Sequence, residues 1–146
     1  MTIYDIIPFL PEVILLSFAL ITIGMAAFRQ KTSVFSLSLF LQSACLLSLT
    51  FLWTHVPYTK YGFSDFLVFN AYTRFFKIII IFAFMGIVAA ISPYLEKEDL
   101  HQPEFFGFMA FAVVGCLLMV SSYHFISLFM AMELASFAMY LMVSHK

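Results

Sequence analysis

The chain has 146 residues, a formal net charge of −1 and 64% hydrophobic residues. Only 10% of the residues are charged, whereas a soluble globular domain has about 25%. This composition excludes a soluble globular domain, a disordered tail and a basic nucleic-acid binder. It predicts an all-α integral membrane protein, because five helices of about 20 residues each would need only about 100 residues.

Five apolar segments are expected to cross the membrane as one membrane domain, 1–146. The predicted helices are 6–28, 34–53, 75–91, 105–120 and 125–143. Pro8 and Pro11 fall at the start of the first helix, where proline is tolerated, and Pro93 is expected to end the third. The short apolar stretch 66–69 cannot span and is expected to lie along the interface. Met1–Leu10 has no basic residue, so we expect the first segment to be retained as a span rather than removed as a signal.

Basic residues outside the spans predict the orientation, because the inner side of a membrane carries an excess of Lys and Arg. Alternating spans place four of them on one side and two on the other: Arg29, Lys31, Lys97 and Lys146 against Lys60 and Arg74. The sequence therefore predicts an outer N-terminus and an inner C-terminus.

Glu133 is a carboxylate near the centre of the fifth span, about 12 to 15 Å from either end at 1.5 Å per residue. A carboxylate at that depth costs at least about 2.5 kcal/mol. It must therefore be protonated, paired with a cation, or turned toward a water-filled cavity. A functional role is the default for such a group, and the alternative is a hydrogen bond between helices that only holds the bundle together.

Two hydroxyl residues share the Glu133 face, since Ser136 and Tyr140 lie within about 60° of it around a helix. A line of hydroxyls beside a carboxylate can pass a proton in short steps, with waters between. Taken alone, Ser136 is typical of helix packing and Tyr140 of an interfacial anchor.

A second polar group, Asn70, Arg74 and Lys77, falls at the start of the third span. We expect Arg74 and Lys77 to extend toward the interface. In the alternative, Lys77 lies deep enough to pair with a carboxylate. Glu12 is expected at the interface, near the positive end of the first helix dipole.

The sequence predicts no cofactor or metal site. Cys45 and Cys116 lie inside apolar runs and are expected to behave as small buried hydrophobes. The histidines fall in loops, in a turn or near the terminus, unlike haem ligands at membrane depth: His55, His101, His124 and His145. No glycine-rich nucleotide loop appears.

Several short motifs occur along the chain in order. The most specific is Glu133-Leu134-x-Ser136-x-x-x-Tyr140 after a tight turn. The weaker ones are Pro11-Glu12, Arg74-Phe75-Phe76-Lys77, Glu104-Phe105-Phe106 and Ser121-Ser122. Together they resemble the N-terminal part of the antiporter-like subunits of respiratory complex I, most closely the family of NADH dehydrogenase subunit 2, called subunit N in bacteria.

The resemblance implies that Glu133 transfers protons in a translocation channel, with Ser136, Tyr140 and Lys77 as weaker candidates for auxiliary roles. In that family the partner lysines lie on later helices, beyond this chain, so a further chain is expected to supply the C-terminal helices and those lysines. His124 stands where the family often has an acidic residue. Other complex I membrane-arm subunits and lipids are the implied partners, in the mitochondrial inner membrane or, alternatively, the bacterial cytoplasmic membrane.

The implied function is that of a membrane-arm subunit of a proton-pumping NADH:quinone oxidoreductase. No redox chemistry is expected on this chain, so electron transport to ubiquinone would occur elsewhere. Two alternatives remain open: a small self-contained proton-coupled transporter, and a structural or assembly subunit.

Overall fold

The computed structural model describes residues 6–28, 33–54, 59–62, 64–98 and 103–144. Its elements are η1 (Ile7–Phe9), α2 (Leu10–Ala27), α3 (Val34–Thr54), β1 (Lys60–Gly62), β2 (Leu67–Phe69), α4 (Ala71–Lys97), α5 (Pro103–Ser121) and α6 (Phe125–Ser144). Within these residues, five spans are long and apolar enough to cross a membrane, with η1 and α2 forming the first. The prediction of an all-α membrane protein with five spans is confirmed.

The third span, α4, is longer than the predicted 75–91 because both of its ends extend. At the start, the Asn70 side chain accepts a hydrogen bond from the Thr73 amide at 3.0 Å. The Asn70 amide in turn donates to the Thr73 hydroxyl at 2.8 Å. This reciprocal cap satisfies two backbone donors and moves the start to Ala71.

The prediction that Pro93 ends this helix was wrong, because Pro93 lies inside α4. The Ser92 hydroxyl donates to the Val88 carbonyl at 2.6 Å, and Leu95 is buried beyond the proline. The Ser92 bond and the burial of Leu95 favour continuing the helix despite the backbone bond that proline removes.

The stretch 66–69 was expected at the interface, but its last three residues form strand β2. β2 pairs antiparallel with β1. Ser64 and Asp65 adopt left-handed backbone angles in the connection, with φ values of 55° and 68°. Asp tolerates this conformation, which lets the chain reverse direction. Pairing satisfies backbone groups that an isolated extended segment would leave open.

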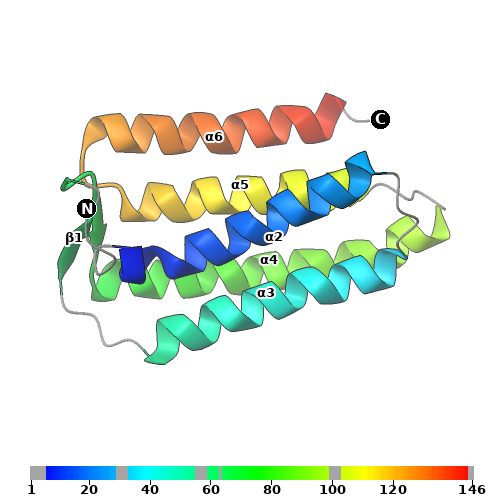
Figure 1. Ribbon diagram of the computed structural model, residues 1–146, viewed down its shortest axis with the longest axis horizontal. Helices are drawn as coiled ribbons and strands as arrows, with labels where there is room; N and C mark the ends of the chain where they lie inside the picture. Colours follow the sequence, from blue (N-terminus) through cyan, green and yellow to red (C-terminus); the bar gives the residue numbers. More distant parts are fainter. Residues whose placement is uncertain (1–5, 29–32, 55–58, 63, 99–102, 145–146) are drawn as a thin grey trace.

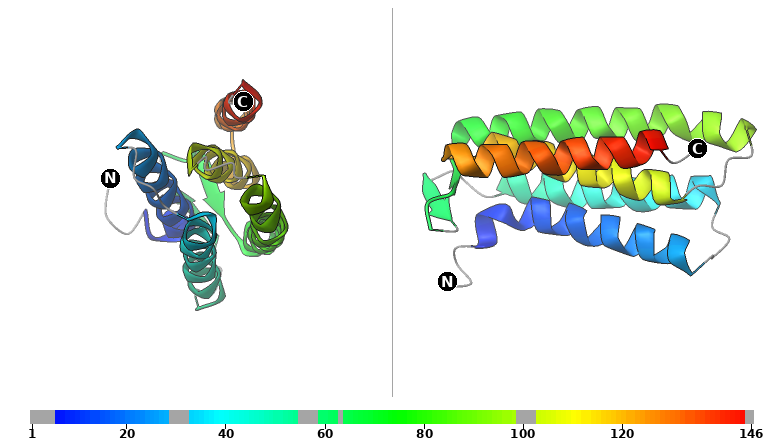
Figure 2. Two further views of the ribbon diagram at one scale, coloured as in Figure 1. Left: turned by 90° about the vertical axis from the view of Figure 1, so that its right-hand side faces the viewer. Right: turned by 90° about the horizontal axis from the view of Figure 1, so that it is seen from above.

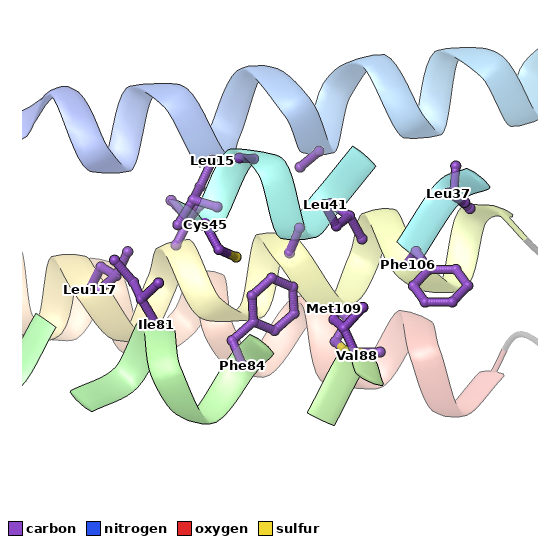
Figure 3. Close-up of a cluster of buried hydrophobic side chains, with 14 of the residues drawn as sticks. Leu15, Leu37, Leu41, Cys45, Ile81, Phe84, Val88, Phe106, Met109 and Leu117 are labelled. Carbon is purple, nitrogen blue, oxygen red and sulfur yellow. The ribbon is translucent and has the colours of Figure 1, made fainter. Parts of the chain in front are cut away.

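Four helices, α2 to α5, form a bundle with a continuous apolar core (Figure 1). The labelled core side chains in Figure 3 all come from these four helices. They are Leu15, Leu37, Leu41, Cys45, Ile81, Phe84, Val88, Phe106, Met109 and Leu117. No residue of α6 is among the buried members of this cluster.

The last helix, α6, is appended to this bundle rather than inserted in it. It packs along α5 and makes no more than marginal contact with the other described helices. The end-on view in Figure 2 shows α6 projecting from the bundle. Its buried residues are Ala131, Ala135 and Ala138. Gly115 of α5 meets this stripe so closely that an added Cβ would lie 2.8 Å from the Ala135 backbone nitrogen.

Candidate functional site

Glu133 lies on α6, eight residues after Phe125 and eleven before Ser144. At 1.5 Å per residue these spacings are about 12 and 16 Å. The helix bounds therefore keep the carboxylate near the middle of the span, at the depth that the sequence predicts.

The Glu133 side chain points away from the rest of the chain. Taking 100° per residue, it lies about 190° around α6 from the mean direction of the alanine stripe that faces α5. The residue is accordingly exposed. Within the described residues no hydrogen bond or ion pair of its carboxylate is formed. The Glu133 carboxylate, which is costly to place in lipid, thus lies on the side of α6 that no other described helix covers. We call this side the open face.

The other two candidates on α6 lie beside this open side. Tyr140 is 72% exposed and Ser136 is half-buried. Helical geometry keeps both within about 60° of Glu133. The structure thus places Tyr140 on the same open face as Glu133, whereas Ser136 lies at the edge of that face. Among the described residues it shows no direct hydrogen bond that joins the three side chains.

Lys77 is the residue whose position differs most from the main expectation. It was expected to extend to the interface, but its side chain is 0% exposed and forms an ion pair with Glu12. Glu12 was expected at the interface as well, yet its residue exposure is 4%. The expectation for Lys77 was wrong, and the alternative in which Lys77 pairs with a carboxylate is the arrangement observed. Two buried charges that neutralise each other avoid the cost of an isolated charge.

Aromatic rings enclose the Lys77 ammonium on other sides. Its nitrogen lies 5.2 Å from the Phe9 ring centroid and 5.4 Å from that of Phe69. Ring faces attract a cation, more strongly when water is excluded. The buried Ser121 hydroxyl lies near the Glu12 carboxylate, although it forms no hydrogen bond within the described residues.

The two groups of this pair lie at the same depth. Glu12 is the sixth residue of its span and Lys77 the seventh of its own, and the first and third spans run in the same direction. The shared depth depends on the start of α4 at Ala71, whereas the predicted start at residue 75 places Lys77 closer to the end of its span. Ser121 gave no signal of its own, because a serine at a helix end is common.

The remaining candidates form no further site. His124 is exposed and its ring contacts the rings of Phe66 and Tyr123 edge-on, at 5.5 and 5.2 Å. Among the residues that the structure describes, no cluster of three His, Cys, Asp or Glu could hold a metal ion. Cys45 is buried, Cys116 is half-buried, and both are free. His55, His101 and His145 lie outside the described residues.

The fold and these charged groups define a multi-pass α-helical membrane protein with ionisable residues inside its spans. Comparison with curated proteins then shows what it is related to. The chain is 27% identical to NADH-quinone oxidoreductase subunit N of Thioalkalivibrio sulfidiphilus over 144 residues, covering 96% of this chain and 29% of that protein. It is 30% identical to the subunit N of Nitrosomonas europaea, covering 96% and 29%. With that of Maricaulis maris it shares 31% identity, covering 97% and 30%.

The predicted resemblance to subunit N is confirmed, and the matches are consistent with the N-terminal part of that subunit. No protein-family model matches the chain. The chain spans about 29% of the length of the curated relatives that it matches first. The similarity to these subunits supports a multi-pass membrane location. Because the relatives are bacterial, they do not confirm the expected mitochondrial membrane.

Proposed function

We propose that this chain forms part of a proton-translocation channel in the membrane arm of a proton-pumping NADH:quinone oxidoreductase. The observation that carries the proposal is the position of Glu133, at mid-span and directed away from every other described helix. The relatives are NADH-quinone oxidoreductase subunits, and this indicates the assembly. A membrane-embedded carboxylate gives this chain a group that can bind and release a proton.

The cost of burying Glu133 indicates what should cover it. A carboxylate at the helix centre costs about 2.5 to 3.5 kcal/mol on insertion scales. Nothing on the open face of α6 within the described residues offsets that cost, and its neighbours there are apolar or aromatic. We therefore propose that helices outside this sequence cover the face and bring a lysine toward Glu133.

Such a lysine would control the protonation of Glu133. A nearby cation favours the carboxylate, whereas a dry apolar surrounding favours the neutral acid. Moving the cation away would cause proton uptake, and its return would cause release. Tyr140 and Ser136 would continue the path toward the inner side, through waters where the hydroxyls are too far apart for direct transfer.

The wider setting belongs to the same proposal. The partners would be other membrane-arm subunits and lipids, and the electron transfer to ubiquinone would take place on other subunits. The membrane would be the mitochondrial inner membrane, with the bacterial cytoplasmic membrane as the alternative that the relatives favour. Fractionation of the source cells, with immunodetection of this chain, separates the two locations.

The test is Glu133→Ala together with the isosteric Glu133→Gln, measured as proton translocation by the assembled enzyme. We expect both to reduce pumping severalfold while the assembly persists on native gels, because an alanine or an amide cannot carry the proton. Glu98→Gln is the matched control, since Glu98 lies beyond the end of α4 and is exposed. Normal pumping by an assembled Glu133 variant would refute the proton-transfer role. Loss of assembly alone would favour a structural role.

The source of the covering helices is tested by purifying the assembly under mild conditions and identifying the polypeptides that accompany this one. Comigration with NADH dehydrogenase activity, and a companion with lysines inside its spans, would support the proposal. A homo-oligomer with no companion would instead favour the self-contained proton-coupled transporter.

A further inference from the structure

The Glu12–Lys77 pair lies where the elements at one end of the bundle converge. Figure 1 shows the hairpin, the starts of α2 and α4, and the α5–α6 turn together at that end. Lys77 belongs to α4 and its partner Glu12 to α2. The two rings near the ammonium come from η1 and from β2. Residues from separate segments therefore share one buried cation.

Two of these contacts lead directly to the turn that starts α6. Phe69 belongs to β2, and β2 also forms a bridge from Leu67 to Ser122 in the turn. Ser121, beside the Glu12 carboxylate, is the residue immediately before Ser122. The charged cluster thus contacts the strand on one side of the turn and the last residue of α5 on the other.

The residues just before β2 extend the same connection into α6. The Phe66 carbonyl accepts a hydrogen bond from the Tyr123 amide at 3.0 Å and from the Ser127 hydroxyl at 2.9 Å. Elsewhere α6 packs mainly along α5, where its buried residues are alanines. The turn therefore fixes where α6 starts, and packing along α5 sets its further course.

We propose that the buried Glu12–Lys77 pair is a positioning site that holds the hairpin against the α5–α6 turn and so fixes the start of α6. The pair does more than join α2 to α4. Its consequence for proton transfer rests on the proposed function of Glu133, whereas its effect on the turn does not.

A disulfide across the hairpin–turn bridge measures this effect in the intact membrane assembly. Leu67 and Ser122 are antiparallel bridge partners, and such partners have Cα atoms about 4.5 to 5.5 Å apart. That separation lies within the range that a disulfide spans. The parent is Leu67→Cys with Ser122→Cys, oxidised under mild conditions. The yield is the fraction of linked peptide found by mass spectrometry.

Four variants are then compared in this parent. Glu12→Gln and Lys77→Met each leave one buried partner unpaired, which is strongly destabilising, so we expect the linked fraction to fall about threefold or more. The double variant Glu12→Gln with Lys77→Met removes both charges at similar volume. We expect it to accumulate, because replacing a whole buried pair is often tolerated, but to keep a reduced linked fraction, because no pair remains to hold the hairpin. Lys97→Met, at the exposed end of the same helix, is the control and should leave the yield unchanged.

The result that overturns the proposal is an undiminished yield in the membrane-inserted single variants, which would mean that the pair acts only between α2 and α4. A double variant with the parental yield would also overturn it, because the hairpin would then stay in place without the pair. If the single variants do not accumulate, the double variant alone becomes the measurement. Its linked fraction must then be lower than that of the parent, and a parental fraction refutes the proposal.

The proposed function can fail separately. Glu133→Gln in the same cysteine parent should leave the linked fraction unchanged, whatever it does to pumping. A loss of yield in Glu12→Gln together with normal pumping in Glu133→Gln would retain the positioning site and reject the proton-transfer role.

Discussion

Two carboxylates that lie away from the ends of their spans, Glu12 and Glu133, have opposite surroundings. Glu12 is 4% exposed and faces Lys77, so its charge is neutralised within this chain. Glu133 is exposed on α6 and has no such partner among the described residues. An internally neutralised pair suits a fixed structural contact. An unneutralised carboxylate on an open face suits a site whose charge is balanced by something that can change.

Gly115 is the residue on which the α5–α6 contact depends. A Cβ added there would lie between 2.8 and 2.9 Å from the Ala135 Cβ, nitrogen and Cα, and the last two are backbone atoms that cannot rotate away. Gly115→Ala must therefore push α6 away from α5. We expect it to lower the stability of the assembly by about 1 to 3 kcal/mol, the usual cost of overpacking. The measurement is the thermal dissociation of the purified assembly in detergent.

The control for this substitution lies within the same chain. Gly86 of α4 has nothing within 4 Å of its added Cβ. Gly86→Ala should leave the dissociation temperature unchanged or raise it slightly, since alanine is the better helix former. Equal behaviour of the two variants would show that α5 and α6 do not approach each other this closely.

The sequence could predict the position of a single residue along its helix, but it could not predict which distant residues its side chain contacts. The depth of Glu133 follows from its place in an apolar run, and the structure agrees. The burial of Lys77 does not follow, because a long basic side chain can extend to water as easily as it can pair. Its direction depends on Glu12, more than sixty positions away in the sequence, and on the rings of Phe9 and Phe69.

At the scale of elements, α4 shows how local chemistry decides where a span begins. Its first turn is held by the reciprocal bonds between Asn70 and Thr73. Asn70→Ala removes the side-chain acceptor, and we expect a loss of about 1 kcal/mol, as for other helix caps. The loss should appear as a lower thermal dissociation temperature of the assembly.

Asn70→Asp is the matched comparison for this cap. Aspartate still offers an oxygen to the Thr73 amide and also suits the positive end of the helix dipole. It should therefore behave like the parent. An alanine variant as stable as the aspartate variant would mean that the cap contributes nothing and that packing alone sets the start of α4.

Whole spans were easier to predict than the segments between them. A run of about 20 apolar residues has few options in a membrane, since its backbone must be satisfied internally. The hairpin was missed because its strands have only three residues each, too few for a recognisable alternation. Its pairing depends on contacts with the α5–α6 turn, which no local pattern reveals.

At the scale of the whole molecule, the chain consists of a self-contained four-helix bundle and a fifth helix with one covered side. The core of α2 to α5 is continuous and supplies most of the buried apolar residues (Figure 3). The fifth helix lies at the periphery of the molecule (Figure 2), and the Glu133 that it carries is exposed. The chain is similar to about 29% of the length of its relative from Thioalkalivibrio sulfidiphilus.

The orientation of the whole molecule yields the last prediction, because the two ends of the bundle carry different groups. The hairpin lies at one end and the C-terminal end of α4 at the other (Figure 1). The excess of basic residues predicts that the hairpin end faces outward. Burial of Lys77 in an ion pair strengthens this reasoning, because Lys77 is removed from the count of surface charges.

Cysteine labelling in sealed, right-side-out membrane vesicles tests the orientation. Ser64→Cys marks the hairpin and Glu98→Cys the far end, and both positions are exposed. A membrane-impermeant maleimide should label Ser64→Cys in intact vesicles and Glu98→Cys only after permeabilisation. The parent is the control, since Cys45 and Cys116 lie inside spans and should stay unlabelled in both conditions. The reverse labelling pattern would invert the topology and would turn the Glu133–Tyr140 line toward the outer side of the membrane.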